Sequence, residues 1–321
     1  MVYQRDYEPD AVKPMRKYIA KHIAPSAAQV MADFNRIYGS MAPLDQSTLY
    51  SMLFESYTVF SKNYVKMYME DFGGSSLENM DAMFTENRAY FTTLSTAYEG
   101  AYTTSIGDGS FCYFGPGYAN SFTVVHELGH FYASRFEDED ESYSLDLAET
   151  HSQGNEWLFM DFLDGKLKAE VHDGLLEYKM LDTIIMIIIC AMIDEFEEKV
   201  YTHPNAGNLS AQDYDKLMEK VAERYGGIDY VSENMTDIQS YWKIVCMESP
   251  VYYISYGVSS VAALNFYTLA QEDRDAARQA YIYITETPDP DRGFLGNIQD
   301  AGLSGPFDEE VYKDLKKLIT E

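Results

Sequence analysis

Apolar residues along most of the chain recur three and four positions apart, which is the period of an amphipathic helix. Between residues 14 and 72 this period predicts two or three helices, and a GGSS break at 73–76 precedes a further predicted helix over 77–91. The same period predicts later helices near residues 145–163, 174–202, 210–225, 251–271, 273–284 and 307–319. Helix should therefore dominate the fold.

One stretch departs from this period. Residues 100–117 contain five glycines and one proline around the aromatic run SFCYF at 110–114, which predicts a strand. The sequence GPG at 115–117 ends that strand, and Ser121 is a predicted cap for a helix over 122–135. The expected fold class is mainly α, with one small antiparallel sheet near this helix.

The chain shows no internal repeat and no flexible linker, so we expect one continuous structural unit. Within it, residues 1–99 should form a helical part that packs on a body formed by residues 100–321. The longest apolar run, residues 184–193, is ten residues long. A membrane-spanning helix needs about 20 residues, so this run predicts a buried helix and no membrane partner.

Charge and cysteine content exclude several classes of protein. The 24 Lys and Arg residues against 52 Asp and Glu residues give a net charge of −28, which argues against nucleic acid as a partner. Cys112, Cys190 and Cys246 are widely spaced and form no CxxC pair, so neither a disulfide framework nor a cysteine zinc site is expected. The first ten residues, MVYQRDYEPD, lack the apolar segment of a signal peptide. We therefore expect a cytoplasmic protein.

Residues 126–130 read HELGH and match the pattern H-E-x-x-H. Because residues four apart share one face of a helix, His126 and His130 are placed to bind one Zn²⁺ ion. Glu127 lies beside them, within reach of a water on the metal. The alternative interpretation is a surface helix whose histidines are solvated.

A catalytic zinc ion needs a third protein ligand and one open position, and a glutamate on the next helix is one common third ligand. Glu149 follows His130 by 19 positions, which leaves room for a turn and an antiparallel helix. Asp146 and Glu156 fall on roughly the same face as Glu149, and either could orient a ligating imidazole. His151 projects to another side of the helix and is not expected to bind the metal.

These residues resemble a known family. FTVVHELGH at 122–130, followed by LAETHSQGNE at 147–156, is similar to the zinc helix and ligand helix of the oligoendopeptidase F and thimet oligopeptidase family of gluzincin metallopeptidases. CAMIDEFEE at 190–198, the tyrosine-rich YYISYGVSSVAA at 252–263 and the stretch 294–307 continue the likeness in the same order. The resemblance covers roughly residue 100 to the C-terminus, the catalytic part of that family, and implies a zincin-like fold.

Position by position, the resemblance places the zinc ligands at His126, His130 and Glu149, and the general base at Glu127. It places two tyrosines that stabilise the transition state at Tyr253 and Tyr256. Tyr252 should be rotated away from them on the same helix.

Two features depart from the family pattern. Oligoendopeptidases usually carry a histidine about ten positions before the second of these tyrosines, and residues 244–248, IVCME, contain none. The family also has a long helical N-terminal portion that roofs the substrate channel, most of which this chain lacks. The chain is therefore either a compact form or a fragment.

The resemblance implies a zinc endopeptidase that acts on short peptides, with one Zn²⁺ per chain and no covalent intermediate. The strand at 110–114 could offer an exposed edge for pairing with an extended substrate. A zinc aminopeptidase is an alternative, although the chain has no GAMEN-like segment to bind a substrate amine. A non-catalytic zinc-binding or peptide-binding relative is another, but such a protein has no use for Glu127. The sequence leaves the oligomeric state open.

Overall fold

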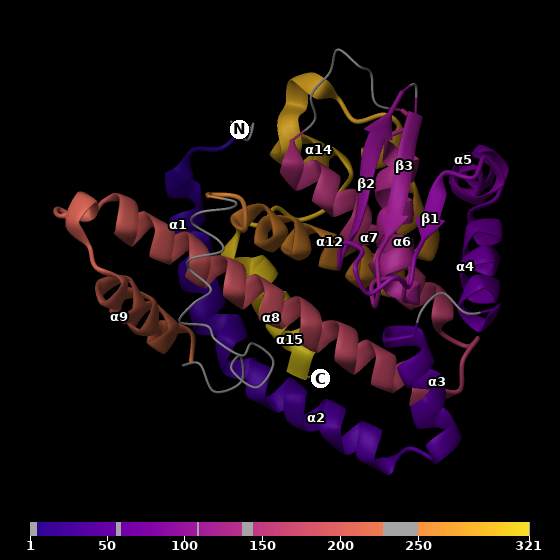
Figure 1. Ribbon diagram of the computed structural model, residues 1–321, viewed down its shortest axis with the longest axis horizontal. Helices are drawn as coiled ribbons and strands as arrows, with labels where there is room; N and C mark the ends of the chain where they lie inside the picture. The colour runs from indigo at the N-terminus through magenta and orange to yellow at the C-terminus, as the bar shows by residue number, and fades with distance from the viewer. Residues whose placement is uncertain (1–4, 56–58, 108, 137–143, 227–249, 321) are drawn as a thin grey trace. The chain divides into compact units, whose positions relative to one another are not determined.

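The structure of the protein is a computed structural model that describes residues 5–55, 59–107, 109–136, 144–226 and 250–320 (Figure 1). These residues fall into two compact units, each of which is described by itself. Unit 1 is drawn from Met1–Asn35, Glu177–Val261 and Ser304–Glu321, and unit 2 from Arg36–Leu176 and Ala262–Leu303. The predicted division at residues 99 and 100 stays a prediction.

Three helices contain residues of both units: α2 (Ala27–Ser40), α8 (Ala169–Tyr201) and α12 (Ile254–Glu272). Unit 2 otherwise consists of α3 (Pro43–Leu53), α4 (Val59–Phe72), α5 (Gly74–Thr85), β1 (Ala89–Phe91), β2 (Ala101–Ile106), β3 (Gly109–Phe114), α6 (Ser121–Ala133), α7 (Leu145–Leu163), α13 (Arg274–Glu286), η6 (Pro290–Arg292) and α14 (Gly293–Asp300). Unit 1 otherwise consists of η1 (Pro9–Ala11), α1 (Val12–Tyr18), the π-helical turn η2 (Ile19–Ile23), η3 (Ala24–Ser26), η4 (Ala206–Asn208), α9 (Ala211–Ala222), η5 (Glu223–Tyr225) and α15 (Glu309–Thr320). The predicted mainly α class with one small sheet is confirmed.

The sheet of unit 2 has the strand order β1-β3-β2 and is mixed, so the prediction of a purely antiparallel sheet was wrong. β2 and β3 pair antiparallel, with Thr103 opposite Cys112, whereas β1 runs parallel to β3. Because side chains alternate along a strand, Cys112 lies buried on the face toward α6, and Tyr113 lies on the opposite face. The sheet thus lies against the helix that carries HELGH (Figure 1).

The predicted helix over residues 77–91 ends earlier than expected, because its last part is a strand. α5 stops at Thr85, and Asn87 adopts a positive φ of 55°, which turns the chain out of the helix. Residues 89–91 then form β1, and the Cys112 N–H donates to the carbonyl of Arg88 at 2.8 Å. Pairing with a distant strand therefore overrode the local helical period.

The core of unit 1 is built on the C-terminal part of α8. The apolar run at residues 184–193 lies within this helix and is largely buried, as predicted. Arg16 on α1 forms ion pairs with Asp194 at 2.9 Å and with Glu198, so charged residues also join these two helices. Among the described residues, no helix combines the length and the apolar character that crossing a membrane requires.

Candidate metal centre

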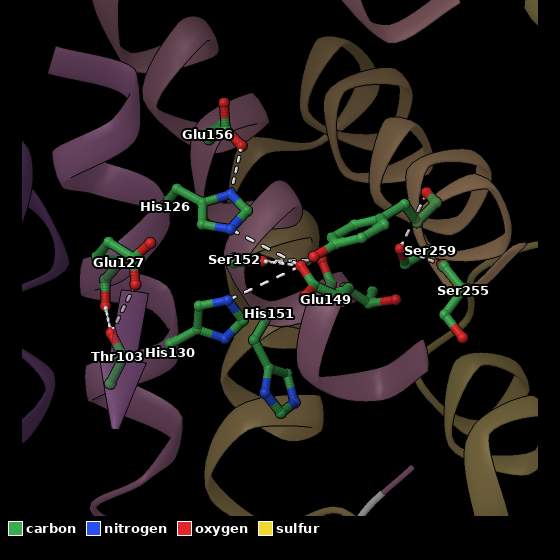
Figure 2. A network of polar contacts seen from close by, with 12 residues as sticks. Thr103, His126, Glu127, His130, Glu149, His151, Ser152, Glu156, Ser255 and Ser259 are labelled. Carbon is green, nitrogen blue, oxygen red and sulfur yellow. Dashed lines mark hydrogen bonds and ion pairs between the residues drawn. The ribbon is translucent and has the colours of Figure 1, made fainter. Parts of the chain in front are cut away.

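Helix α6 presents the two histidines of the motif. Its N-cap is Asn120, whose side chain accepts a hydrogen bond from the Thr123 N–H at 3.0 Å, rather than the predicted Ser121. Residues 126 and 130 then fall one helical turn apart, with imidazole centroids 5.0 Å apart. Figure 2 shows both rings directed toward Glu149.

Helix α7 approaches α6 closely, and Gly129 makes this approach possible. A Cβ atom at residue 129 would lie 2.8 Å from the carbonyl oxygen of His151 and from the Cα of Ser152. The buried side chain of Asn155 also joins the helices, because its Nδ2 donates to the Val125 carbonyl at 2.7 Å. Two helices joined in this way hold Glu149 against the face that carries His126 and His130.

The donor atoms of His126, His130 and Glu149 lie within 4.8 Å of one another. Among the described residues, they form the group of histidine, cysteine or acidic side chains that is close enough together to bind a metal ion. Glu149 Oε2 is 3.7 Å from His126 Nε2 and 3.8 Å from His130 Nε2. Tetrahedral zinc with bonds of about 2.0–2.2 Å separates its ligand atoms by about 3.4 Å. The two distances from the carboxylate to the imidazoles come close to this value, so the three side chains fit a zinc ion.

Glu156, one of the two residues predicted to orient a ligand, contacts His126. The Nδ1 atom of His126 lies 2.8 Å from Glu156 Oε1, so Nδ1 donates the bond and Nε2 is the nitrogen that faces Glu149 and would bind a metal in place of a proton. Burial lowers the pKa of His126, but the hydrogen bond and the charge of Glu156 outweigh it and raise the pKa to about 9. Burial lowers the pKa of His130 well below its usual value, and the charge of His126 adds to this effect.

Three carboxylates around the imidazoles are buried, which is unusual for glutamate unless a cation balances the charge. Glu127, Glu149 and Glu156 are only 4%, 6% and 8% exposed. Burial raises the pKa of Glu149 to about 7, although the charge of His126 and the hydroxyl of Ser152 act against it. A divalent cation at this cluster would balance the buried negative charge.

Glu127 contacts the sheet through one oxygen of its carboxylate. Its Oε2 accepts a hydrogen bond from Thr103 Oγ1 on β2 at 2.7 Å, and burial raises its pKa. Figure 2 shows the two side chains together. Sequence reasoning missed Thr103, because only the strand register brings a residue 24 positions upstream against the motif.

His151 makes a separate contact on the other side of α7. Its Nε2 donates to the carbonyl of Ile284 at 2.8 Å, and burial lowers the pKa of His151 to about 4. The imidazole is therefore neutral, and its Nε2 is hydrogen-bonded to the main chain of α13. This arrangement agrees with the expectation that His151 is not a metal ligand.

The predicted catalytic tyrosines belong to unit 1. Tyr253 lies in the turn before α12, and Tyr256 lies in the first turn of the helix. Tyr252 was expected to face elsewhere, but its Oη lies 2.9 Å from the Oη of Tyr256, so these two residues form a pair. The helix begins at Ile254, three residues later than predicted. Tyr252 and Tyr256 are four positions apart, the spacing that brings two side chains together on one helical face, so the expectation for Tyr252 was wrong. The roles of Tyr253 and Tyr256 stay predictions.

The free edge of the sheet lies on another strand than expected. The strand at 110–114 exists as β3, but it is the central strand of the sheet, so it has no free edge for a substrate. β2 is an outer strand and has such an edge among the described residues. Cys246 and the segment 244–248, where the family histidine is missing, lie outside the described residues.

Comparisons with known proteins find a family and a fold that match this chain. The sequence model of Peptidase family M3 matches residues 117–284. An assigned oligoendopeptidase F from Bacillus anthracis str. Ames has a TM-score of 0.76 at 18% identity, over 98% of this chain and 56% of that chain. PZ peptidase A with inhibitor 2 gives a TM-score of 0.76 at 18% identity, over 98% and 59% of the two chains.

A second assigned oligoendopeptidase F gives a TM-score of 0.73 at 18% identity, over 98% and 58% of the two chains. The chain therefore shares the fold of these structures and spans a little over half of their length. Comparison with curated proteins gives no significant match.

Proposed function

Because the chain belongs to peptidase family M3, the family that its motifs resemble, we propose that it is a zinc-dependent endopeptidase acting on short peptides. One observation carries the proposal. His126, His130 and Glu149 bring two nitrogen donors and one oxygen donor together, and Glu127 follows His126 directly in the chain. A structural zinc site has no need for this additional buried carboxylate.

Each residue of the centre has a proposed task. His126, His130 and Glu149 would hold the zinc ion, and Glu156 would fix the orientation of His126 through its Nδ1 proton. A bound zinc ion supplies Lewis acidity, which lowers the pKa of water and polarises the scissile carbonyl.

Glu127 is the proposed general base. Its Oε2 accepts the hydrogen bond from Thr103, so Oε1 is the atom proposed to take a proton from the attacking water and to return it to the leaving amine. Its raised pKa suits this task, because a carboxylate whose pKa lies nearer to neutral pH takes a proton from water more readily. Tyr253 and Tyr256 are proposed to donate hydrogen bonds to the oxyanion of the substrate.

The outer strand β2 is the proposed substrate-binding strand. An extended peptide that adds to a free sheet edge is held through its main chain, so recognition should tolerate many side chains. β2 also carries Thr103, which contacts Glu127, so a peptide on this edge would lie beside the residues of the motif. This location replaces the one expected on the strand at 110–114.

Metal analysis and turnover of a quenched peptide library test the proposal. We expect about one zinc per chain and cleavage that is lost on chelation. Glu127→Gln should keep zinc and lose nearly all cleavage, whereas Glu78→Gln, at an exposed glutamate on α5, should behave as wild type. A metal-replete Glu127→Gln protein with full turnover would refute the mechanism.

A blocked N-terminus distinguishes the enzyme classes. An endopeptidase cleaves an N-acetylated peptide, and an aminopeptidase does not. Absence of cleavage from every peptide in a zinc-replete sample would instead indicate a binding protein.

A further inference from the structure

Thr103 holds the carboxylate of Glu127 from the neighbouring strand. Its Oγ1 lies 2.7 Å from Glu127 Oε2 and 3.3 Å from the Glu127 carbonyl. An ionised carboxylate only accepts hydrogen bonds, so the hydroxyl is the donor to Oε2. A hydrogen bond to a charged, buried group is among the stronger kinds in proteins.

The strand fixes the direction of this hydroxyl. Threonine is β-branched, so its χ1 angle has few options, and Thr103 lies opposite Cys112 in the antiparallel register of β2 and β3. The Sγ of Cys112 lies 3.2 Å from Thr103 Oγ1 and is fully buried. The threonine side chain is therefore held between the sheet and α6, with its hydroxyl directed at Glu127.

The main chain of Thr103 faces the other way, toward the free edge of the sheet. The Cys112 N–H donates to Arg88 on the β1 side, and the Gly115 N–H donates to Gly100 on the β2 side. Because these directions alternate along β3, the main-chain groups of Cys112 do not bond to β2. The N–H and C=O of Thr103, its partner in the register, consequently point away from β3.

We infer that Thr103 is a positioning residue for Glu127: its hydroxyl fixes one carboxylate oxygen of the base, and its main chain belongs to the edge that would bind the peptide. This inference rests on the proposed function. A single residue then links peptide pairing on β2 to the direction of Glu127 Oε1. Loss of the hydroxyl should leave the peptide edge intact and misdirect the base.

Three variants test the inference by kinetics. Thr103→Val keeps the branched shape and removes the donor, so kcat should fall about 10- to 100-fold while KM changes less than about twofold. Thr103→Ser restores the donor and should recover most of the kcat. Thr85→Val makes the same substitution at an exposed threonine at the end of α5 and should leave both constants unchanged.

A thermal measurement tests the contact without relying on activity. In the zinc-loaded protein, Thr103→Val should lower Tm by several degrees, and the same substitution in a Glu127→Ala background should lower it clearly less. Zinc content should stay at the wild-type level in Thr103→Val. Should Val at position 103 prevent folding, Thr103→Ala carries the same two tests.

The outcomes separate this inference from the proposed function. A Thr103→Val enzyme with wild-type kcat, in a protein that Glu127→Gln inactivates, overturns the positioning role and leaves the peptidase intact. Equal Tm losses in the two backgrounds also overturn it. A fully active Glu127→Gln enzyme refutes the proposed function itself, whatever the Thr103 variants show.

Discussion

Gly129→Ala should disturb the metal centre without changing any proposed ligand. The new Cβ would lie 2.8 Å from two backbone atoms of α7, whereas ordinary contacts begin near 3.4 Å, so α7 must move by about 0.6 Å. Backbone gives way less easily than a side chain, and overpacking of this kind costs about 1–3 kcal/mol. A gain of about 1 kcal/mol in helix propensity offsets part of this cost.

Chemical denaturation and zinc competition with a chromophoric chelator measure the two effects. Gly39→Ala on α2 is the matched control, because nothing lies within 4 Å of a Cβ there and the propensity gain acts alone. The free energy of unfolding of Gly129→Ala should fall below that of the control by about 1–3 kcal/mol. Because Glu149 moves with α7, zinc affinity should fall about tenfold or more. Wild-type zinc affinity, with the stability of the control, would refute the close-packing argument.

Three other predictions concern separate residues. Glu149→Ala should lose most of the zinc measured by metal analysis, because two imidazoles alone bind it weakly. Tyr256→Phe should lower kcat about 10²- to 10³-fold at unchanged zinc content, and a wild-type kcat would mean that Tyr256 contributes to packing and not to catalysis. Tyr252→Phe should be measured in the same experiment, because the hydroxyl of Tyr252 contacts that of Tyr256. Burial raises the pKa of Asp194 to about 6, although the charge of Arg16 lowers it. The folded state therefore binds an extra proton between about pH 4 and pH 6, and the contribution of Asp194 to stability falls as pH rises through that interval. Denaturation at pH 4 and pH 7 should show a smaller fall for Asp194→Asn than for wild type, by roughly 2–3 kcal/mol, and equal falls would contradict the assignment.

Local patterns predicted the parts of the centre that local geometry determines. The spacing of His126 and His130 defines one helical face, and the helix predicted over residues 145–163 coincides with α7, which carries Glu149. The partnership of Glu156 with an imidazole also followed from its place on the face of Glu149. These inferences needed only the helical period and one turn between two helices.

Contacts between distant segments could not be predicted from local sequence patterns. β1 forms because residues 89–91 pair with β3, and the helical period before it gave no sign of that partner. Thr103 meets Glu127 only through the register of β2 on β3, and no motif marks a threonine for such a contact.

The compact placement of the metal donors in the chain has a consequence for the order of folding. His126 and Glu149 are separated by only 23 positions, and the two helices that carry them are neighbours in sequence. Contacts of short sequence separation form early, because little chain entropy is lost in closing them. Zinc could therefore be captured by a nascent helical hairpin before Tyr253 and Tyr256, more than 100 positions further along the chain, have found their places. Refolding with and without the metal should then differ in its earliest phase.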